Sequence, residues 1–338
     1  MSTKEKNIIP RATGLLVIAV ENVNPNGDPD RESDPRQRSH DRRGYISGVS
    51  FKRKLRDLIE LKDGPIWQHM KKKLAINNDD SFCILESRER GFSDVKDASE
   101  AWRKILKLID QGNNGSEVAN KYWDARIFGA TFLEKGEEAS KTGSSTVRDR
   151  KYIRTGVAQF GIAVSVAPVR IHRDTNTKKT SAQESKERGM APLACRYVEH
   201  GIYCMPFFVN PTAAIQSGCT LKDIALLLSM IKHAYPNTRS AARGHGLIEV
   251  VHAWYAEHED QLGSFSEFEL IEKLTPRRKG GDREMPSVSG ILLNDQYEVP
   301  DKVPSDFRGK LKNGKLYDLC VELPEWCSSI KGDGKNGK

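Results

Sequence analysis

Several classes of protein are excluded by what this chain of 338 residues lacks. Its six cysteines are irregularly spaced and form no CxxC pair, so we expect neither a disulfide framework nor a zinc site. The longest unbroken apolar run, residues 15–20, is too short to cross a bilayer, and the polar N-terminus has no apolar segment behind it of the kind that a secretory signal needs. We therefore expect a soluble cytoplasmic protein with no membrane partner.

Signatures of known enzyme classes are also missing. Residues 309–316 imitate a P-loop but place Leu316 where a serine or threonine must meet Mg²⁺, and no G-x-S-x-G nucleophile elbow is present. No aromatic signature for stacking bases on a sheet appears, which favours contact with a nucleic-acid backbone by lysine and arginine. The sequence thus predicts no catalytic residue, no metal and no cofactor.

Positive charge is present in excess and is concentrated near the N-terminus. The net charge is +8, and residues 31–56 alone hold nine basic and three acidic residues. Ser47 is typical of an N-cap, and the apolar spacing after it predicts a helix that ends near Leu61. On this helix no carboxylate accompanies the basic residues until Asp57, so we expect phosphate as their counter-ion, with an idle charged surface as the alternative. The basic residues are Lys52, Arg53, Lys54 and Arg56.

Hydrophobic periodicity predicts the fold class. Strands are expected at residues 14–20, 157–166, 196–210 and 247–255, and a second helix begins at Thr220 with a T-x-x-D capping box. With the first helix, the order is βαββαβ, an α+β ferredoxin-like (RRM-like) arrangement. Such a sheet has one face covered by helices and one free face, and RNA-binding domains of this shape use the free face, but the fold alone does not decide the function.

The second strand and the segments between the predicted elements carry further expectations. In the strand at 157–166, alternation places Phe160, Ile162, Val164 and Val166 on one face. Residues 98–111 suggest a helix within a long insert, and residues 170–188 are too hydrophilic to pack, so they should form an exposed arm or loop.

Two segments could bind an anion or a metal. The first, residues 24–30, is dense in turn formers, and its Asp28 and Asp30 could ligate Mg²⁺; the alternative is a rigid turn. The second, residues 238–246, joins a helix to the last strand. Its Arg239 and Arg243 lie among small residues, and its glycines could form an anion nest, although an ordinary connection is as consistent with the pattern.

Four segments, in order along the chain, resemble one family. Residues 21–30 and 44–56 are similar to the opening of the CRISPR-associated Cascade backbone subunit, the Cas7 family of the RAMP superfamily. Residues 122–130 (YWDARIFGA) and 239–244 (RSAARG) agree with the same family. The type I-C and I-B forms are the most similar.

The resemblance implies a hand-shaped subunit that polymerises along a guide RNA. Its RRM-like palm would comprise residues 14–61, 156–167 and 196–256. Large inserted fingers would comprise residues 62–155, and a protruding thumb arm residues 168–195. Residues 257–338 form a C-terminal extension without a counterpart, with a flexible tail from about residue 328. The RNA-binding residues implied by the family and by the charge pattern are Lys52, Arg53, Lys54, Arg56, Arg239, Ser240, Arg243, Gly244, Asn24, Arg31 and Met190.

The functional hypothesis is a non-catalytic scaffold that binds crRNA in a type I Cascade surveillance complex. Its partners would be the guide RNA, copies of itself in a helical filament, other Cascade subunits, and target DNA through the guide. A scaffold that accepts any guide must hold phosphates and leave base edges free. Two alternatives remain open: a metal-dependent ribonuclease that uses Asp28 and Asp30, as in type III backbone subunits, and a free-standing RNA-binding module.

Overall fold

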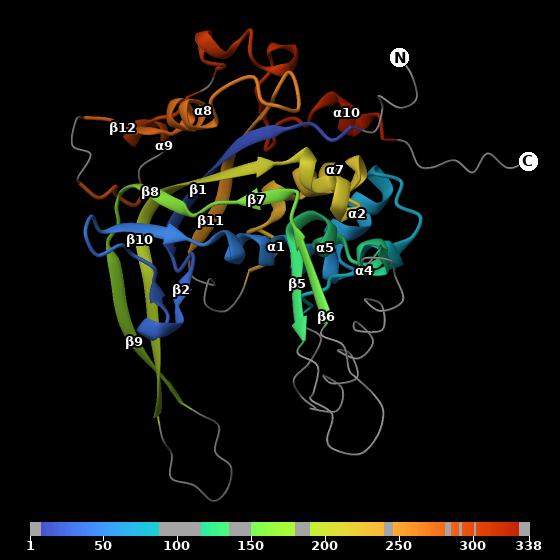
Figure 1. The fold of residues 1–338 in the computed structure, drawn as a ribbon. Coiled ribbons are helices and arrows are strands. Elements are labelled where there is room, and N and C mark those ends of the chain that lie inside the picture. Colours follow the sequence, from blue (N-terminus) through green and yellow to red (C-terminus); the bar gives the residue numbers. More distant parts are fainter. Residues whose placement is uncertain are drawn as a thin grey trace, which may run out of the picture.

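The protein consists of a central β-sheet with helices on both of its faces (Figure 1). The computed structural model describes residues 8–87, 116–134, 150–179, 190–239, 246–280, 285–290, 293–300 and 302–330. The strands are β1 (Ala12–Val23), β2 (Gly27–Asp28), β3 (Asp34–Pro35), β4 (Arg43–Ile46), β5 (Gly129–Glu134), β6 (Arg150–Thr155), β7 (Ala158–Phe160), β8 (Ala163–Pro168), β9 (Ile171–Lys179), β10 (Met190–Val209), β11 (Leu247–Glu257), β12 (Arg277–Arg278), β13 (Tyr297–Glu298) and β14 (Tyr317–Asp318). The α-helices are α1 (Gly48–Glu60), α2 (Pro65–Lys73), α4 (Ser116–Lys121), α5 (Trp123–Phe128), α6 (Pro211–Ser217), α7 (Leu221–Met230), α8 (Glu267–Leu274), α9 (Leu293–Gln296) and α10 (Glu325–Ser328). Short 3₁₀ turns are η2 (Pro29–Arg31), η3 (Asp79–Phe82), η5 (Ile231–His233), η7 (Ser305–Phe307) and η8 (Lys312–Gly314).

The main sheet is antiparallel and has the order β14-β11-β1-β10-β8-β4. Its centre is β1, which pairs along its length with β10 on one side and with β11 on the other. The four strands expected from the sequence therefore stand in the order β11-β1-β10-β8. Helices α1 and α7 lie in the two connections where helices were expected.

Both predicted helices begin where their capping residues indicate. The Ser47 hydroxyl accepts a hydrogen bond from the Ser50 amide at the start of α1, and the helix ends at Glu60. At α7, Thr220 and Asp223 form the reciprocal capping box. Local side-chain chemistry fixes these ends, because a helix leaves its first amides without intrahelical partners.

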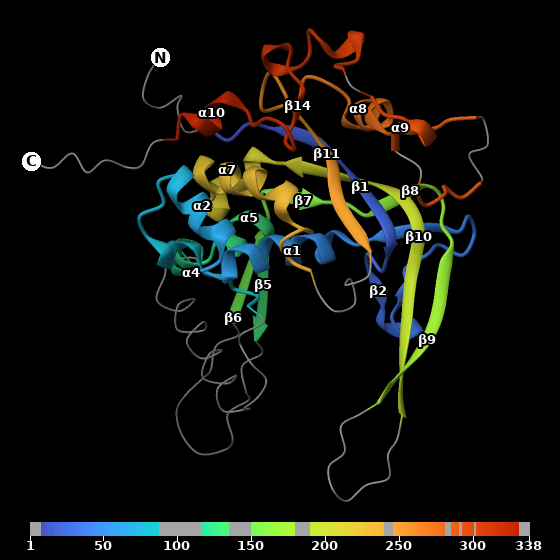
Figure 2. The ribbon, with the colours of Figure 1, turned by 180° about the vertical axis from the view of Figure 1, so that it is seen from behind.

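Two hydrophobic clusters lie on opposite faces of the sheet. Leu16 and Ile18 of β1 pack in the first cluster with Phe51 of α1, whereas Leu15 and Val17 face the second. Successive residues of a strand point to opposite faces, so a continuous apolar run such as β1 needs cover on both sides. Figure 2 shows these two sides, with α1 and α5 on one and α8 and α9 on the other.

The prediction of a free sheet face is wrong. Leu270 and Leu274 of α8, with Phe307, pack against Leu15 and Val17 and are fully or almost fully buried. The C-terminal extension, for which the resemblance offered no counterpart, therefore supplies the second layer of the core. Sequence periodicity could not show this, because an amphipathic helix does not reveal which surface it covers.

The expected single strand at 157–166 is also wrong. Phe160 pairs with Phe207 and Val164 with Cys204. An advance of four residues along this segment therefore matches an advance of three residues along β10. One extra residue is a β-bulge, and it moves the following side chains to the opposite face. Phe160 consequently packs with the first cluster and Val166 with the second, while Ile162 is 59% exposed at the break.

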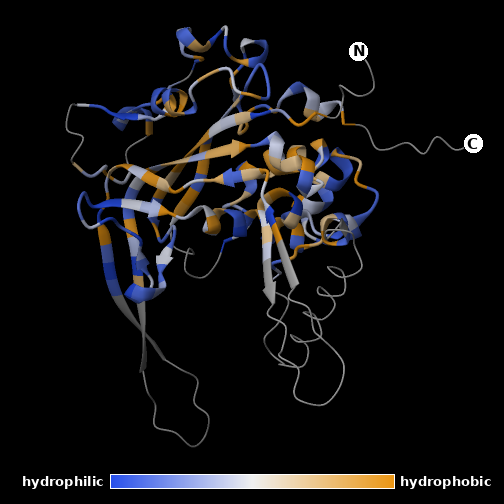
Figure 3. Ribbon diagram, viewed as in Figure 1, coloured by the Kyte–Doolittle hydropathy of each residue, from blue (hydrophilic) through white to orange (hydrophobic). Residues whose placement is uncertain are grey.

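The polar arm is a two-stranded ribbon that projects from the sheet (Figures 1 and 2). It consists of β9 and the first part of β10, paired from Ile171 and Val198 to Lys179 and Met190. The predicted boundary between arm and palm, at residue 196, lies inside the single strand β10. Figure 3 shows that hydrophobic residues concentrate in the sheet and its helices, whereas hairpin β2–β3 at the base of the arm is largely hydrophilic.

Much of the predicted fingers insert belongs to the body of the protein. Helices α2 and α5 contribute Trp67, Trp123 and Ile127 to the first hydrophobic cluster, next to α1 and α7. The ribbon β5–β6 projects beside the arm (Figure 1). The helix expected at 98–111 and the tail beyond residue 330 lie outside the described residues.

Neither a disulfide nor a membrane-spanning helix was expected from the sequence. All six cysteines lie within the described residues, and none forms a disulfide. In the same part of the chain no single helix has the length and apolar character needed to cross a bilayer. One pair, Pro211–Ser217 with Leu221–His233, meets that test jointly, but it is bent by 118°.

Candidate nucleic-acid interface

Helix α1 is held at its start by the turn that follows β1. The Asn26 carboxamide oxygen accepts a hydrogen bond from the Ser47 amide at 2.9 Å, and the Ser47 side chain in turn caps the helix. The apolar face of α1, with Phe51 and Leu55 at its centre, is buried in the first cluster. The basic residues of α1 are thereby directed to the flanks of the helix.

The two arginines of α1 are already paired with carboxylates. Arg53 binds Asp57 at 2.7 Å and also Glu60, and its guanidinium donates to the Glu86 carbonyl oxygen. Arg56 is 4% exposed and binds the Asp124 carboxylate at 2.9 Å. The premise that the basic residues of this helix lack carboxylate partners is therefore wrong. Asp57 and Glu60 of the helix itself bind Arg53, and the fold brings Asp124 and Glu86 from the insert to Arg56. Phosphate contact by these two arginines stays a prediction.

The two lysines of α1 differ in exposure. Lys54 is 6% exposed. Lys52 is partly exposed, its ammonium lies 5.3 Å from the Phe128 ring centroid, and burial together with the nearby Arg56 charge lowers its pKa. Among the described residues Lys52 forms no ion pair with a carboxylate, so its partly exposed charge is available to a ligand.

The turn after β1 has the structure of a rigid hairpin. Asn24 donates to the Ser33 carbonyl oxygen at 2.8 Å, and the Asp28 carboxylate caps η2 by accepting from the Asp30 amide. Arg36 lies 3.6 Å from the same carboxylate. Within the described part of the chain, no three histidine, cysteine or acidic side chains gather as a metal site would require.

The hairpin is fastened to the base of the arm. The Asp34 carboxylate accepts hydrogen bonds from Arg173 of β9, at 2.6 Å for the shortest, and lies 3.4 Å from Arg196 of β10. The hydrogen bond from Arg173 holds the pKa of Asp34 below its ordinary value. Arg196 also donates to the Glu32 backbone and side chain, and to the carbonyl oxygen of exposed Arg31. The position of Arg31 is thus fixed relative to the arm.

The predicted anion-binding segment, residues 238–246, is described only at its two ends. Arg239 is exposed where the described range ends, and Ser240, Arg243 and Gly244 lie outside the described residues. The chain resumes at Gly246, where an added Cβ would stand 2.1 Å from the Asn22 carbonyl oxygen. Only glycine permits this approach. Gly246 therefore lies against the end of β1, next to the turn that carries Asn24 and Arg31.

The remaining predicted residue, Met190, is the first residue of β10. It pairs with Lys179 at the far end of the described ribbon. It therefore lies on the arm, at the end of the ribbon farthest from β1, whose Val23 pairs with Val198.

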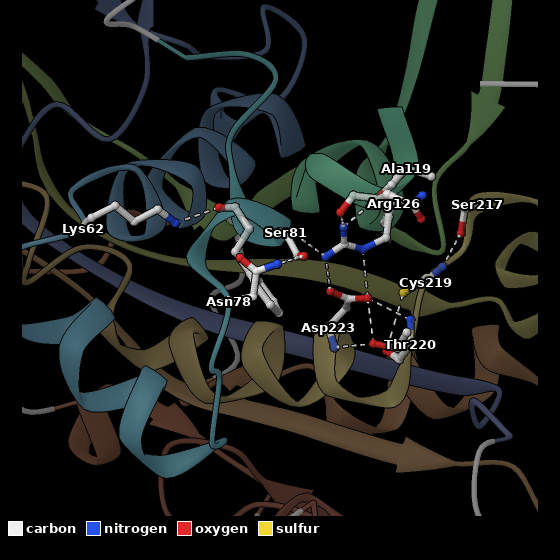
Figure 4. Close-up of polar contacts among 11 residues, drawn as sticks. Lys62, Asn78, Ser81, Ala119, Arg126, Ser217, Cys219, Thr220 and Asp223 are labelled. Atoms are coloured by element: carbon white, nitrogen blue, oxygen red, sulfur yellow. Dashed lines mark hydrogen bonds and ion pairs between the residues drawn. The ribbon is translucent and has the colours of Figure 1, made fainter. Parts of the chain in front are cut away.

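The motif at 122–130 forms two buried ion pairs. Asp124 binds Arg56, as above, and also accepts hydrogen bonds from the amides of Leu85 and Glu86. Arg126 binds Asp223 of α7 at 2.7 Å, and its guanidinium donates to the Ala119 and Ser81 carbonyl oxygens (Figure 4). These residues join the insert to α1 and α7.

Reasoning from the sequence alone missed the structural roles of Asp124, Arg126 and Asp34. A signal for the first two was available, because residues two apart on a helix point to opposite sides and can pair with different neighbours. No such signal marks Asp34, since its partners Arg173 and Arg196 lie far away in the sequence.

The family model for CRISPR-associated protein Cas7 matches residues 10–294. The chain belongs to the Cas7 family. The match includes the hairpin, α1, the insert, the arm and the helix α8 that covers the second sheet face. It ends before the last 3₁₀ turns and α10.

Individual Cas7 relatives are distant in sequence. The CRISPR-associated protein Cas7 of Haloferax volcanii is 24% identical over 239 residues, which cover 67% of this chain and 64% of that protein. Similar solved structures include a chain of a CRISPR RNA-guided surveillance complex, pre-nicking, with 13% identity, TM-score 0.45 and coverage of 84% and 85%. A chain of another CRISPR RNA-guided surveillance complex has 12% identity, TM-score 0.42 and coverage of 84% and 79%.

Proposed function

We propose that this Cas7-family chain is a non-catalytic, crRNA-binding backbone subunit of a type I Cascade complex. Copies of the chain would polymerise head to tail along the guide RNA, bind its phosphates and present its bases to target DNA. Other Cascade subunits would complete the assembly, which we expect in the cytoplasm. A head-to-tail contact that does not close produces an open helix, so the RNA length would set the number of copies.

One observation carries this proposal beyond the family membership. Three points far apart in the sequence meet at the end of β1: the turn with Asn24 and Arg31, the start of α1 at Ser47, and Gly246, where the described chain resumes. Arg31 is exposed in the turn, and its neighbour Glu32 already binds Arg196, so the Arg31 cation stays available for an anionic ligand. Such a surface suits contact with phosphates, which gives affinity without reading the sequence.

The sheet order supports the same proposal. We infer that β11-β1-β10-β8, with α1 and α7 between them, is the RRM-like palm, and that ribbon β9–β10 is the thumb. The hydrogen bonds that Arg173 donates to the Asp34 carboxylate would then fix the thumb relative to the RNA-binding turn. The C-terminal elements cover the second face of this sheet, so the guide would contact the end of β1 and the flank of α1 instead.

The test is a titration of the purified chain with guide-length RNAs of unrelated sequence, at several salt concentrations. We expect similar affinities for all sequences and a steep loss of affinity with salt. Strong preference for one sequence, or affinity that does not respond to salt, would overturn the proposal. A free-standing RNA-binding module would bind the same RNAs as separate monomers, which sizing of the complexes would reveal.

A further inference from the structure

A cavity lies where the edge of the main sheet meets the C-terminal elements. Its volume is about 380 Å³, and Arg277 lines both this cavity and a second one of similar volume beside it. The walls of the first come from β4, β8, α8 and β12, which are elements from both ends of the chain. The lining residues are Arg43, Val166, Glu272, Thr275, Pro276, Arg277 and Arg278.

The charge of this cavity is mainly positive. Its lining holds three arginines and one carboxylate, that of exposed Glu272; Arg43 also lies 3.7 Å from the Asp41 carboxylate, which leaves Arg277 and Arg278 as the main source of positive charge. Arg277 is exposed and has no ion-pair partner among the described residues. Arg278 is held in place, because its guanidinium lies 5.3 Å from the Tyr297 ring centroid and donates to the Gln296 side chain at 2.9 Å. Guanidinium groups placed in this way match the geometry of phosphate oxygens.

The lining also indicates which class of anion it would accept. A protein segment usually needs apolar side chains as anchors in a pocket, and Val166 and Pro276 are the apolar residues here. A polynucleotide needs mainly cations along its path. We propose that this cavity binds the phosphodiester backbone of a single-stranded polynucleotide, with Arg277 as the central contact.

This contact goes beyond the proposed function, because it lies on a different face of the sheet. Val166 packs with the second hydrophobic cluster, whereas α1 packs with the first. A strand bound along α1 would have to pass around the edge strand β4 to reach Arg277. The phosphodiester could therefore belong to a flanking segment of the guide or to a second strand, and the experiment must separate these two sources.

The experiment uses the full-length chain with any RNA that it carries from expression. Fluorescence anisotropy would follow the binding of a labelled thymidine oligonucleotide of about 20 nucleotides, a length that spans several phosphate contacts, at increasing salt. A parallel titration would use a guide-length RNA. The variant is Arg277→Ala. The matched control is Arg308→Ala, which removes the same charge from an exposed site on the same extension and outside both cavities.

We expect Arg277→Ala to weaken binding roughly 3- to 10-fold and to reduce the salt slope by roughly 0.7, the value for one phosphate contact on a single strand. Arg308→Ala should bind as the unmodified chain does. Weaker binding of the thymidine strand alone identifies a second strand as the ligand, and weaker binding of the guide identifies its flanking segment. Equal effects of the two variants, or no effect of Arg277→Ala on either strand, would overturn the inference. Failure of the chain to bind guide RNA would contradict the proposed function but leave the thymidine titration valid.

Discussion

Arg126 and Asp223 form a buried, two-point ion pair between α5 and α7, with nitrogen–oxygen distances of 2.7 and 3.1 Å. The Arg126 side chain is 8% exposed and that of Asp223 is 1% exposed. Asp223 also belongs to the capping box that begins α7. One side chain therefore fixes the insert and also begins a helix of the central layer.

Loss of one partner of this pair should destabilise the protein strongly. We expect Asp223→Asn to lower the free energy of unfolding by about 3–5 kcal/mol, because the buried Arg126 charge would lose its counter-ion. Chemical denaturation followed by circular dichroism would measure this change. Asp79→Asn is the control, since the Asp79 pair with Lys71 is about one-third exposed and should contribute little. Equal losses in the two variants would contradict the structural role of Arg126.

Arg56 and Arg239 should respond differently to removal of their charge. Arg56→Ala leaves Asp124 buried without its cation, so we expect a loss of about 3–5 kcal/mol in the free energy of unfolding. Arg239→Ala should leave stability unchanged and reduce the salt slope of guide binding by roughly 0.7, because an exposed phosphate contact is lost. Denaturation and salt titration of both variants test this difference. A variant of Arg56 that folds with full stability and shows only weaker RNA binding would contradict the assignment.

His258 should make the stability of the protein depend on pH. Burial lowers its pKa to about 4, the Ser264 amide donates to its Nδ1, and its ring stacks 3.7 Å from that of Phe265. Its ordinary pKa is near 6.5, so between about pH 6.5 and 4 the unfolded chain binds a proton that the folded chain does not. The contribution of His258 is complete above pH 6.5 and is lost as the pH falls through this window, by at most about 1.4 kcal/mol per pH unit.

Denaturation of the unmodified chain and of His258→Gln at pH 7 and pH 5 measures this contribution. The variant should be less stable at pH 7, because it loses the stacking contact, but its stability should fall less between the two pH values. His40→Gln is the control, since His40 is exposed beside Asp41. The same dependence on pH in all three proteins would rule out the protonation of His258 as the cause.

Substitution of Asp28 and Asp30 should not alter RNA integrity. Asp28 caps η2 and lies close to Arg36, so one of its carboxylate oxygens, Oδ1, already has partners within the hairpin. We expect guide RNA to remain intact over hours in Mg²⁺ with the unmodified chain and with the Asp28→Asn, Asp30→Asn double variant. Gel electrophoresis of end-labelled RNA is the measurement, with chelator added as the control. Cleavage that the double variant abolishes would establish the ribonuclease alternative.

Local features could be predicted from the sequence because the determinants lie next to each other in the chain. Ser47 and the Thr220 capping box begin α1 and α7 at the expected positions, since caps act through neighbouring amides. The apolar run of β1 forms a strand buried on both faces. The order of strands and helices along the chain could be predicted because hydrophobic periodicity is also a local property.

The rest depended on partners distant in the sequence. The bulge at Ile162 arises from the register against β10, and local alternation does not report register. The carboxylates that neutralise Arg56 come from residues 86 and 124, outside α1. A count of charges within the helix alone therefore gave too high a value for the positive charge available to a ligand. The extension that covers the second face has its own apolar spacing, which does not identify its partner.

The central claim is that copies of this chain assemble on a polynucleotide by its phosphates. Its most direct test is to purify the full-length chain with its native CRISPR locus, extract the bound nucleic acid and determine its length and the number of chains per strand. We expect guide RNA of discrete length, with a copy number that increases in proportion when the guide is lengthened. Protein free of nucleic acid, or a fixed copy number whatever the RNA length, would contradict it.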